Sequence, residues 1–160
     1  MILVFNNKQM NSRKISVKDF LVTYKWRNDI TSIKNSKSQN RISLYSHLKW
    51  FKKNLNSEKN FYGYIFFDSQ KRKIGLVFFK KIDNEKFLIS INLNPKFRGS
   101  GHSNVILKKA IMDFREEETA EIIAEIMSQN FISIKLFTKH NFKPTKSKKL
   151  INFNTYLLKK

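Results

Sequence analysis

Three apolar segments in the middle of the chain constrain its fold more than any other feature. They are Phe61–Phe67, Ile74–Lys80 and Phe87–Leu93, each about as long as a β-strand. Polar turn residues separate them, Asp68-Ser69 after the first segment and Asp83-Asn84 after the second. Strands joined by such short connections pair with their neighbours in opposite directions. The sequence therefore predicts a three-stranded antiparallel meander.

Two helices are predicted before this meander. Ser16 can cap a helix running over residues 17–28, and Ser43 can cap a second helix. Between the two helices, residues 31–41 are polar and aperiodic, which predicts a loop. The second helix has an apolar stripe that we expect to face the core, with His47 beside it. The stripe consists of Leu44, Leu48, Phe51 and Leu55.

After the meander the pattern alternates between helix and strand. Residues 106–114 have helical apolar spacing, Glu121–Met127 reads as a strand, and residues 131–140 read as a short helix. A last strand is expected near residues 150–158, and Ile2–Phe5 is a candidate first strand. A meander followed by helical crossovers predicts a mixed α/β (α+β) sheet with helices on both faces. We expect residues 1–160 to form a single domain.

The composition excludes several classes of protein. The chain has no Cys, which rules out disulfide frameworks, thiolate zinc sites and cysteine nucleophiles. Its three His have no acidic partner at ligand spacing, so we expect no metal. No apolar run approaches the roughly 20 residues that cross a bilayer. We therefore expect a cytoplasmic protein that does not bind membranes.

The charge balance has two interpretations. The chain carries 32 basic and 12 acidic side chains, a formal net charge of +20. Such an excess is typical of proteins that bind nucleic acids or the ribosome, because Lys and Arg neutralise phosphates. The basic residues are, however, scattered along the whole chain, which favours compositional drift together with a preference for a small anionic ligand. We expect the small ligand first and keep nucleic acid as the alternative.

One loop has the features of an anion site. Residues 94–103 lie between a predicted strand and a predicted helix, and they include Gly99 and Gly101. Glycines let the backbone approach a ligand closely, and the first amides of a helix bind phosphate oxygens. The dinucleotide fingerprint fails because Asn104 occupies the third glycine position, and no Gly-Lys-Ser/Thr follows for a nucleoside-triphosphate loop. A plain turn before a helix is the alternative interpretation.

Two motifs resemble those of the GNAT superfamily of acyl-CoA N-acyltransferases. The pattern Arg98-x-x-Gly101-x-Ser103 resembles the Arg/Gln-x-x-Gly-x-Gly/Ala pyrophosphate loop of that family. The segment 130–142, which begins Asn130-x-x-Ser133, resembles its second acetyl-CoA motif. The resemblance covers nearly the whole chain.

The resemblance implies a fold and an activity. The fold is the GNAT fold, a central mixed but mostly antiparallel sheet of six to seven strands with splayed central strands and about four flanking helices. The activity is N-acetyl transfer from acetyl-CoA, a co-substrate, to the primary amine of a small acceptor. The segments Trp26-Arg27-Asn28 and 47–51 are similar to the branch that acetylates amino sugars in pseudaminic-acid and related nonulosonic-acid pathways. A nucleotide-linked amino sugar is therefore the first choice of acceptor.

Other functions stay open at this point. The chain could acetylate a protein N-terminus or a Lys side chain, or it could be a non-catalytic, basic nucleic-acid or ribosome-associated module. The oligomeric state, monomer or homodimer, also stays open.

The resemblance further implies how acetyl-CoA is held. The backbone amides from Arg98 to Ser103 would bind the pyrophosphate, and an amide near Leu93 would polarise the thioester carbonyl. Asn130 would contact acetyl-CoA from the end of the neighbouring strand. The implied residues are Leu93, Arg98, Gly99, Ser100, Gly101, His102, Ser103, Asn130 and Phe137.

The proton-transfer groups depart from the family pattern. Phe137 stands where many members carry a Tyr that protonates the departing thiolate, so another group must replace that Tyr or the thiolate leaves unaided. The candidate replacements are Tyr24, Tyr45, Tyr62, Tyr64 and a water molecule. The candidate catalytic residues are His47, Ser90, Asn92 and Ser133.

His47 is the candidate base, because its reference pKa near 6.5 suits proton uptake at neutral pH. The alternative is a histidine packed in the core. Trp26, Arg27, Asn28 and His47 would face the acceptor, with Arg27 gripping a phosphate. The alternatives are a core position for Trp26 and the end of a surface helix for Arg27 and Asn28.

Overall fold

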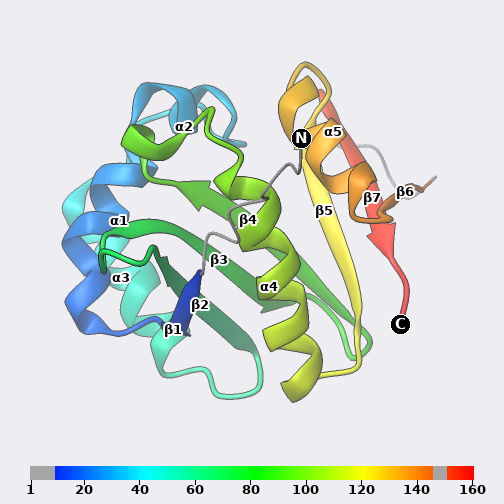
Figure 1. Cartoon of the computed structure of the whole chain (residues 1–160), viewed down its shortest axis with the longest axis horizontal. Coiled ribbons are helices and arrows are strands. Elements are labelled where there is room, and N and C mark those ends of the chain that lie inside the picture. The colour runs from blue at the N-terminus through cyan, green and yellow to red at the C-terminus, as the bar shows by residue number, and fades with distance from the viewer. Residues whose placement is uncertain (1–9, 146–150) are drawn as a thin grey trace, which may run out of the picture.

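The computed structural model describes residues 10–145 and 151–160, and these fold around one seven-stranded sheet (Figure 1). The strand order is β1-β2-β3-β4-β5-β7-β6. The strands are β1 (Asn11–Lys14), β2 (Phe61–Phe67), β3 (Lys73–Lys81), β4 (Lys86–Leu93), β5 (Glu121–Met127), β6 (Lys143–Pro144) and β7 (Phe153–Leu158). The helices are α1 (Phe20–Arg27), α2 (Ile30–Lys34), α3 (Leu44–Leu55), α4 (His102–Glu117) and α5 (Phe131–Lys139), with short 3-10 turns at Val17–Asp19 and Pro95–Phe97.

The predicted meander is confirmed. β2, β3 and β4 pair antiparallel in sequence order, and β1 adds to the outer edge of β2. α4 then carries the chain across the sheet to β5, which runs parallel to β4. All other neighbouring strands are antiparallel, so the sheet is mixed and mostly antiparallel, as expected.

The central strands are splayed. β4 and β5 are registered only over Lys86–Leu88 and Glu121–Ile123. Beyond these residues the two strands separate, so Ile89–Leu93 and Ala124–Met127 do not pair with each other. Figure 1 shows the widening gap between β4 and β5. The splayed centre implied by the family resemblance is therefore confirmed.

Each face of the sheet has its own apolar core. On one face α4 crosses the central strands (Figure 1), and the ring of Phe114 stacks on Phe79 with centroids 4.2 Å apart. On the other face α1 and α3 contribute Trp26 and Phe51, which pack with Ile65 of β2. Alternate residues of a strand point to opposite faces, so the sheet supplies side chains to both cores. Helices therefore cover both faces, as predicted.

The predicted core stripe of the second helix is confirmed for Phe51 and Leu55, which pack in the core, and wrong for its first two leucines. Leu44 and Leu48 of α3 are 49% and 36% exposed. The buried residues of α3 are His47, Phe51 and Asn54. Two of these are aromatic rings that pack between α3 and its neighbours, a contact that the spacing of the leucines does not reveal.

The predicted loop over residues 31–41 is also wrong in part. It contains most of α2, whose first N–H groups are capped by the carboxylate of Asp29, at 3.1 Å from Thr31 N and 3.4 Å from Ser32 N. A helix of five residues is too short for its periodicity to be recognised. β1 was not predicted, and the candidate strand Ile2–Phe5 lies outside the described residues. Within the described part of the chain, no helix is long and apolar enough to cross a membrane.

Candidate functional site

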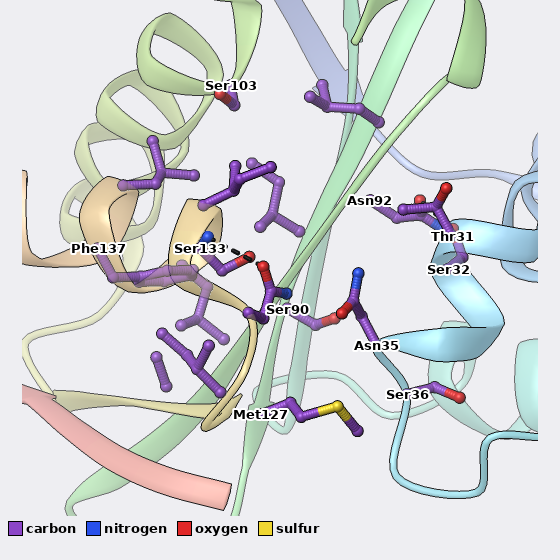
Figure 2. Close-up of a pocket in the computed structure, with 18 of the residues that line it drawn as sticks. Thr31, Ser32, Asn35, Ser36, Ser90, Asn92, Ser103, Met127, Ser133 and Phe137 are labelled. Carbon is purple, nitrogen blue, oxygen red and sulfur yellow. Dashed lines mark hydrogen bonds between the residues drawn. The ribbon is translucent and has the colours of Figure 1, made fainter. Parts of the chain in front are cut away.

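A cleft of about 410 Å³ opens where β4 and β5 separate. Its floor and walls come from Ile89–Leu93, Ala124–Met127, α2 and α5. Figure 2 shows Ser133 of α5 and Ser32 of α2 on opposite sides of this cleft, with Ser90 of β4 between them. The splay of the sheet thus brings together side chains from four elements that are distant in sequence.

The edge of β4 that faces the cleft presents backbone hydrogen-bonding groups. The N–H of Asn94 donates to the carbonyl of Ile74 at 2.8 Å, so the backbone groups of Asn94 point toward β3. Successive residues of a strand point their N–H and C=O groups to opposite sides. The backbone groups of Ile91 and Leu93 therefore point away from β3 and toward the cleft. An extended ligand can bind along this edge as an added strand would.

The loop between β4 and α4 has the backbone geometry of an anion site. Gly99 and Gly101 have φ of +76° and +79°, in the left-handed region, and a Cβ at either position would meet no atom of the described residues within 4 Å. Gly101 is the N-cap of α4, so the first amides of a 16-residue helix lie directly after it. Gly99 and Ser103 line the cleft, whereas Ser100, Gly101 and His102 do not. The loop leaves room for a phosphate close to its backbone.

The side chain of His102 packs inside this loop. This side chain is buried, its Nδ1 lies 2.5 Å from the hydroxyl of Ser100, and its ring packs edge-on against Phe97. His102 is among the residues implied to hold acetyl-CoA, but its ring does not line the cleft. The ring stabilises the turn that presents the amides.

The motif at the start of α5 contributes to one wall of the cleft. The side chain of Asn130 caps α5, with its Oδ1 accepting from Ser133 N at 3.1 Å. Asn130, Ser133 and Phe137 all line the cleft. Phe137 is largely buried and packs against Phe142. The aromatic ring at position 137 thus completes the core under α5.

Three of the predicted acceptor residues lie away from the cleft, which corrects the expected placement. Trp26 is buried in the core between α1 and the sheet. The side chain of Asn28 holds the backbone of Ile42 through two hydrogen bonds of 2.8 and 3.0 Å. His47 is buried among aromatic rings, with its Nε2 3.1 Å from Thr23 Oγ1, and burial lowers its pKa. For Trp26 and His47, core packing was the alternative that the sequence left open.

Arg27 is the predicted acceptor residue that does line the cleft. Its Nη2 donates to Ser38 Oγ at 3.2 Å. Its Nη1 is buried without a hydrogen-bond partner among the described residues. Burial lowers the pKa of the guanidinium. Arg27 therefore offers an unused donor to a ligand.

Glu125 was missed by the sequence analysis. It is the single carboxylate among the described residues that line the cleft, and it forms an ion pair with Lys37. A charged residue inside the otherwise apolar segment 122–127 is the sequence signal that could have revealed it. Its neighbours Ala124 and Ile126 are buried, so Glu125 lies on the opposite face of the strand.

No tyrosine among the described residues lines the cleft. The hydroxyl of Tyr64 donates to Glu117 of α4 at 2.8 Å, on the far side of the sheet from Trp26. The proposed replacements Tyr24, Tyr45, Tyr62 and Tyr64 are thus away from the cleft, which leaves hydroxyl donors such as Ser90 and Ser133 inside it. The described residues contain no group of three or more potential metal ligands.

Comparisons with known proteins agree with this geometry. A family model described as an acetyltransferase (GNAT) domain matches residues 11–143. No curated protein matches the chain. Among solved structures, a domain from Methanocaldococcus jannaschii is 22% identical with a TM-score of 0.81, covering 94% of this chain and 97% of that one. Spermidine N-acetyltransferase from Vibrio cholerae, in complex with CoA and spermine, is 16% identical with a TM-score of 0.79, covering 94% of both chains.

Proposed function

The chain belongs to the acetyltransferase (GNAT) domain family and is an acetyl-CoA-dependent N-acetyltransferase, and from this premise we propose that its acceptor is a nucleotide-linked amino sugar. The proposal rests on the types of side chain that line the cleft wall opposite α5. This wall consists of neutral hydroxyl and amide side chains next to the half-buried guanidinium of Arg27. Its neutral members are Thr31, Ser32, Asn35 and Ser36 (Figure 2).

Hydroxyl and amide groups suit the hydroxyls of a sugar, because each can both donate and accept hydrogen bonds. Arg27 suits a phosphate, because the guanidinium fork matches phosphate oxygens and its Nη1 is not used elsewhere among the described residues. The amino sugar would therefore lie along α2 with its phosphates toward Arg27.

The same wall argues against a polyamine acceptor. A polyamine carries several positive charges, which carboxylates would have to balance. Glu125 is the single carboxylate lining the described cleft, and Lys37 already pairs with it. The formal net charge of +20 also repels a polycation and attracts an anionic acceptor.

The residues around the cleft fit acetyl-CoA as the second substrate. The amides from Gly99 to Ser103 would bind the pyrophosphate at the start of α4. The cleft-facing edge of β4 would pair with the pantetheine amides. The N–H of Leu93, which points into the cleft, would donate to the thioester carbonyl as negative charge develops on its oxygen.

Glu125 is the proposed proton acceptor. An aliphatic amine is protonated at neutral pH, since its pKa is about 10.4, and it must lose a proton before its nitrogen can attack the thioester. The carboxylate of Glu125 lies in the cleft and would take that proton, while Lys37 holds it in place. The C–N bond then forms and the C–S bond breaks. The second proton on the attacking nitrogen passes to the departing CoA thiolate, either directly or relayed through the hydroxyl of Ser133, so that a neutral amide and a neutral thiol result.

A thiol-release assay tests the acceptor. Wild-type protein with acetyl-CoA should release CoA in the presence of nucleotide-linked amino sugars, and spermidine should give no release above background. Arg27→Gln should raise KM for the nucleotide sugar, whereas Arg27→Lys should keep part of the affinity because the charge remains. Acetylation of spermidine, or equal KM values for wild type and Arg27→Gln, would reject the proposal.

Two further expectations belong to this proposal. We take residues 1–160 as one domain, in line with the single sheet that contains every described strand. We also place the enzyme in the cytoplasm, which is compatible with a chain that has no cysteine.

A further inference from the structure

The side chain of Arg98 links three parts of the molecule that surround the cleft. Its Nη1 forms an ion pair with Asp29, which precedes α2. Its Nη2 donates to Ser32 Oγ of α2 at 3.0 Å and to the carbonyl of Leu93, at the end of β4, at 3.2 Å. Arg98 itself starts the loop that leads to α4. One guanidinium thus joins three parts: the cleft wall formed by α2, which we call the acceptor wall, the end of β4, and the loop that contains Gly99 and Gly101.

Asp29 holds this guanidinium in place. Burial disfavours its charged form, but the hydrogen bond from Arg98 and those from two backbone N–H groups outweigh this effect and lower its pKa. Asp29 is therefore ionised at neutral pH. The same carboxylate oxygen caps α2, so the position of Arg98 is tied to the start of that helix.

The network continues onto β4. The hydroxyl of Ser32 accepts from Arg98 and donates to Asn92 Oδ1 at 3.1 Å. Asn92 and Leu93 are consecutive residues of β4, and both line the cleft, as Figure 2 shows for Asn92. Hydrogen bonds thus connect α2 to the end of β4 by two routes, from Asp29 through Arg98 to Leu93 and from Arg98 through Ser32 to Asn92.

We propose that Asp29 is a positioning residue for acetyl transfer, which acts through Arg98 to fix the end of β4 and the glycine loop against α2. Asp29 does not line the cleft itself. Its loss would release the guanidinium and let the backbone of Leu93 and the loop shift relative to the acceptor wall. A misplacement of about 1 Å is enough to cost roughly 100-fold in rate. The proposal depends on acetyl-CoA binding and not on the identity of the acceptor.

The variant Asp29→Asn separates the two roles of this residue. Asn caps helices about as well as Asp and has nearly the same shape, but it has no charge to hold Arg98. Calorimetric titration with CoA should show an affinity about tenfold weaker, or about 1.4 kcal/mol, at an almost unchanged melting temperature. Because Asp29 acts through Arg98, the double variant Asp29→Asn/Arg98→Gln should bind CoA no more weakly than Arg98→Gln alone. Asp113→Asn, which removes the partner of Lys109 on α4, is the control for the change in charge.

Each outcome either supports or overturns the positioning role of Asp29. A tenfold loss in Asp29→Asn, a double variant no weaker than Arg98→Gln and no loss in Asp113→Asn support the positioning role. Unchanged or tighter CoA binding by Asp29→Asn overturns it, because Asp29 would then only occupy Arg98. A double variant about tenfold weaker than Arg98→Gln also overturns it, because Asp29 would then act independently of Arg98. If Asp29→Asn does not fold, Asp29→Ser, which also caps helices, takes its place in the same comparison.

Discussion

Gly101 is the position where one substitution tests the placement of acetyl-CoA. Its φ of +79° is left-handed, and a Cβ would meet no atom within 4 Å in the part of the chain that the structure describes. The cost of Gly101→Trp to the fold is therefore conformational, about 1–2 kcal/mol for an L residue in this region. For a chain of this size such a cost lowers the melting temperature by about 2–8 °C. The native state survives it, because domains are stable by roughly 5–15 kcal/mol.

The effect on binding should be much larger. The indole would fill the space over the first amides of α4, where we place the pyrophosphate, so the affinity for acetyl-CoA should fall about 100-fold or more, or about 2.7 kcal/mol. Titration calorimetry measures the affinity, and a thermal melt confirms that the variant is folded. Gly101→Asn is the matched control, because Asn tolerates a left-handed backbone and is small; it should bind far more tightly than Gly101→Trp. A folded Gly101→Trp protein with wild-type affinity would refute the placement.

The remaining predictions concern proton transfer and acid stability. Glu125→Gln should lower kcat about 100-fold or more, and wild-type turnover in this variant would eliminate Glu125 as the proton acceptor. His47→Gln should leave the pH–rate profile unchanged, because His47 is packed away from the cleft; loss of a neutral-range pH dependence would make it the base after all. Burial lowers the pKa of His47, so the folded protein should lose stability as the pH falls from about 7 to about 5, and His47→Gln should reduce that loss in urea titrations. Burial opposes the ionisation of Asp19, but the ion pairs with Arg13 and Lys73 lower its pKa to about 2. The contribution of Asp19 to the free energy of unfolding should therefore persist above about pH 4 and disappear as the pH falls toward 2. A urea midpoint that is flat over this range would contradict the pairing.

The strands at the centre of the fold were predictable because their apolar segments are continuous and of strand length. Phe61–Phe67 and Glu121–Met127 are observed with the predicted bounds. Gly99 and Gly101 were predictable for a different reason, since glycine is the residue that most readily adopts the left-handed backbone of a tight turn between a strand and a helix. Both adopt positive φ in the structure.

The predictions failed where two faces of one helix could both pack against the core, or where the contact of a residue lies far away in the sequence. Leu44 and Leu48 of α3 share a helical stripe with Phe51, yet His47 is the buried residue in that part of the helix, because the partner surface on α1 is aromatic. Periodicity identifies a stripe but does not choose between two overlapping stripes.

Glu125 and Arg98 show the same limit at the site. Glu125 is polar in an apolar strand, but only the separation of β4 from β5 turns its position into part of a cleft. The motif around Arg98 draws attention to its backbone, whereas its side chain binds Asp29, which is 69 residues away in sequence. The family resemblance implied the splay, but no local pattern showed that it would expose Glu125 or that Arg98 would contact Asp29.

The central claim is that the cleft between β4 and β5 holds acetyl-CoA through backbone groups, and titration calorimetry at moderate and high salt tests it most directly. We predict one acetyl-CoA bound per chain with micromolar affinity, most of it retained at high salt, because amide contacts and strand-like pairing do not depend on the protein's net charge of +20. Absence of binding, or an affinity that falls with ionic strength as steeply as that of a protein bound to a polyanion, would contradict the claim.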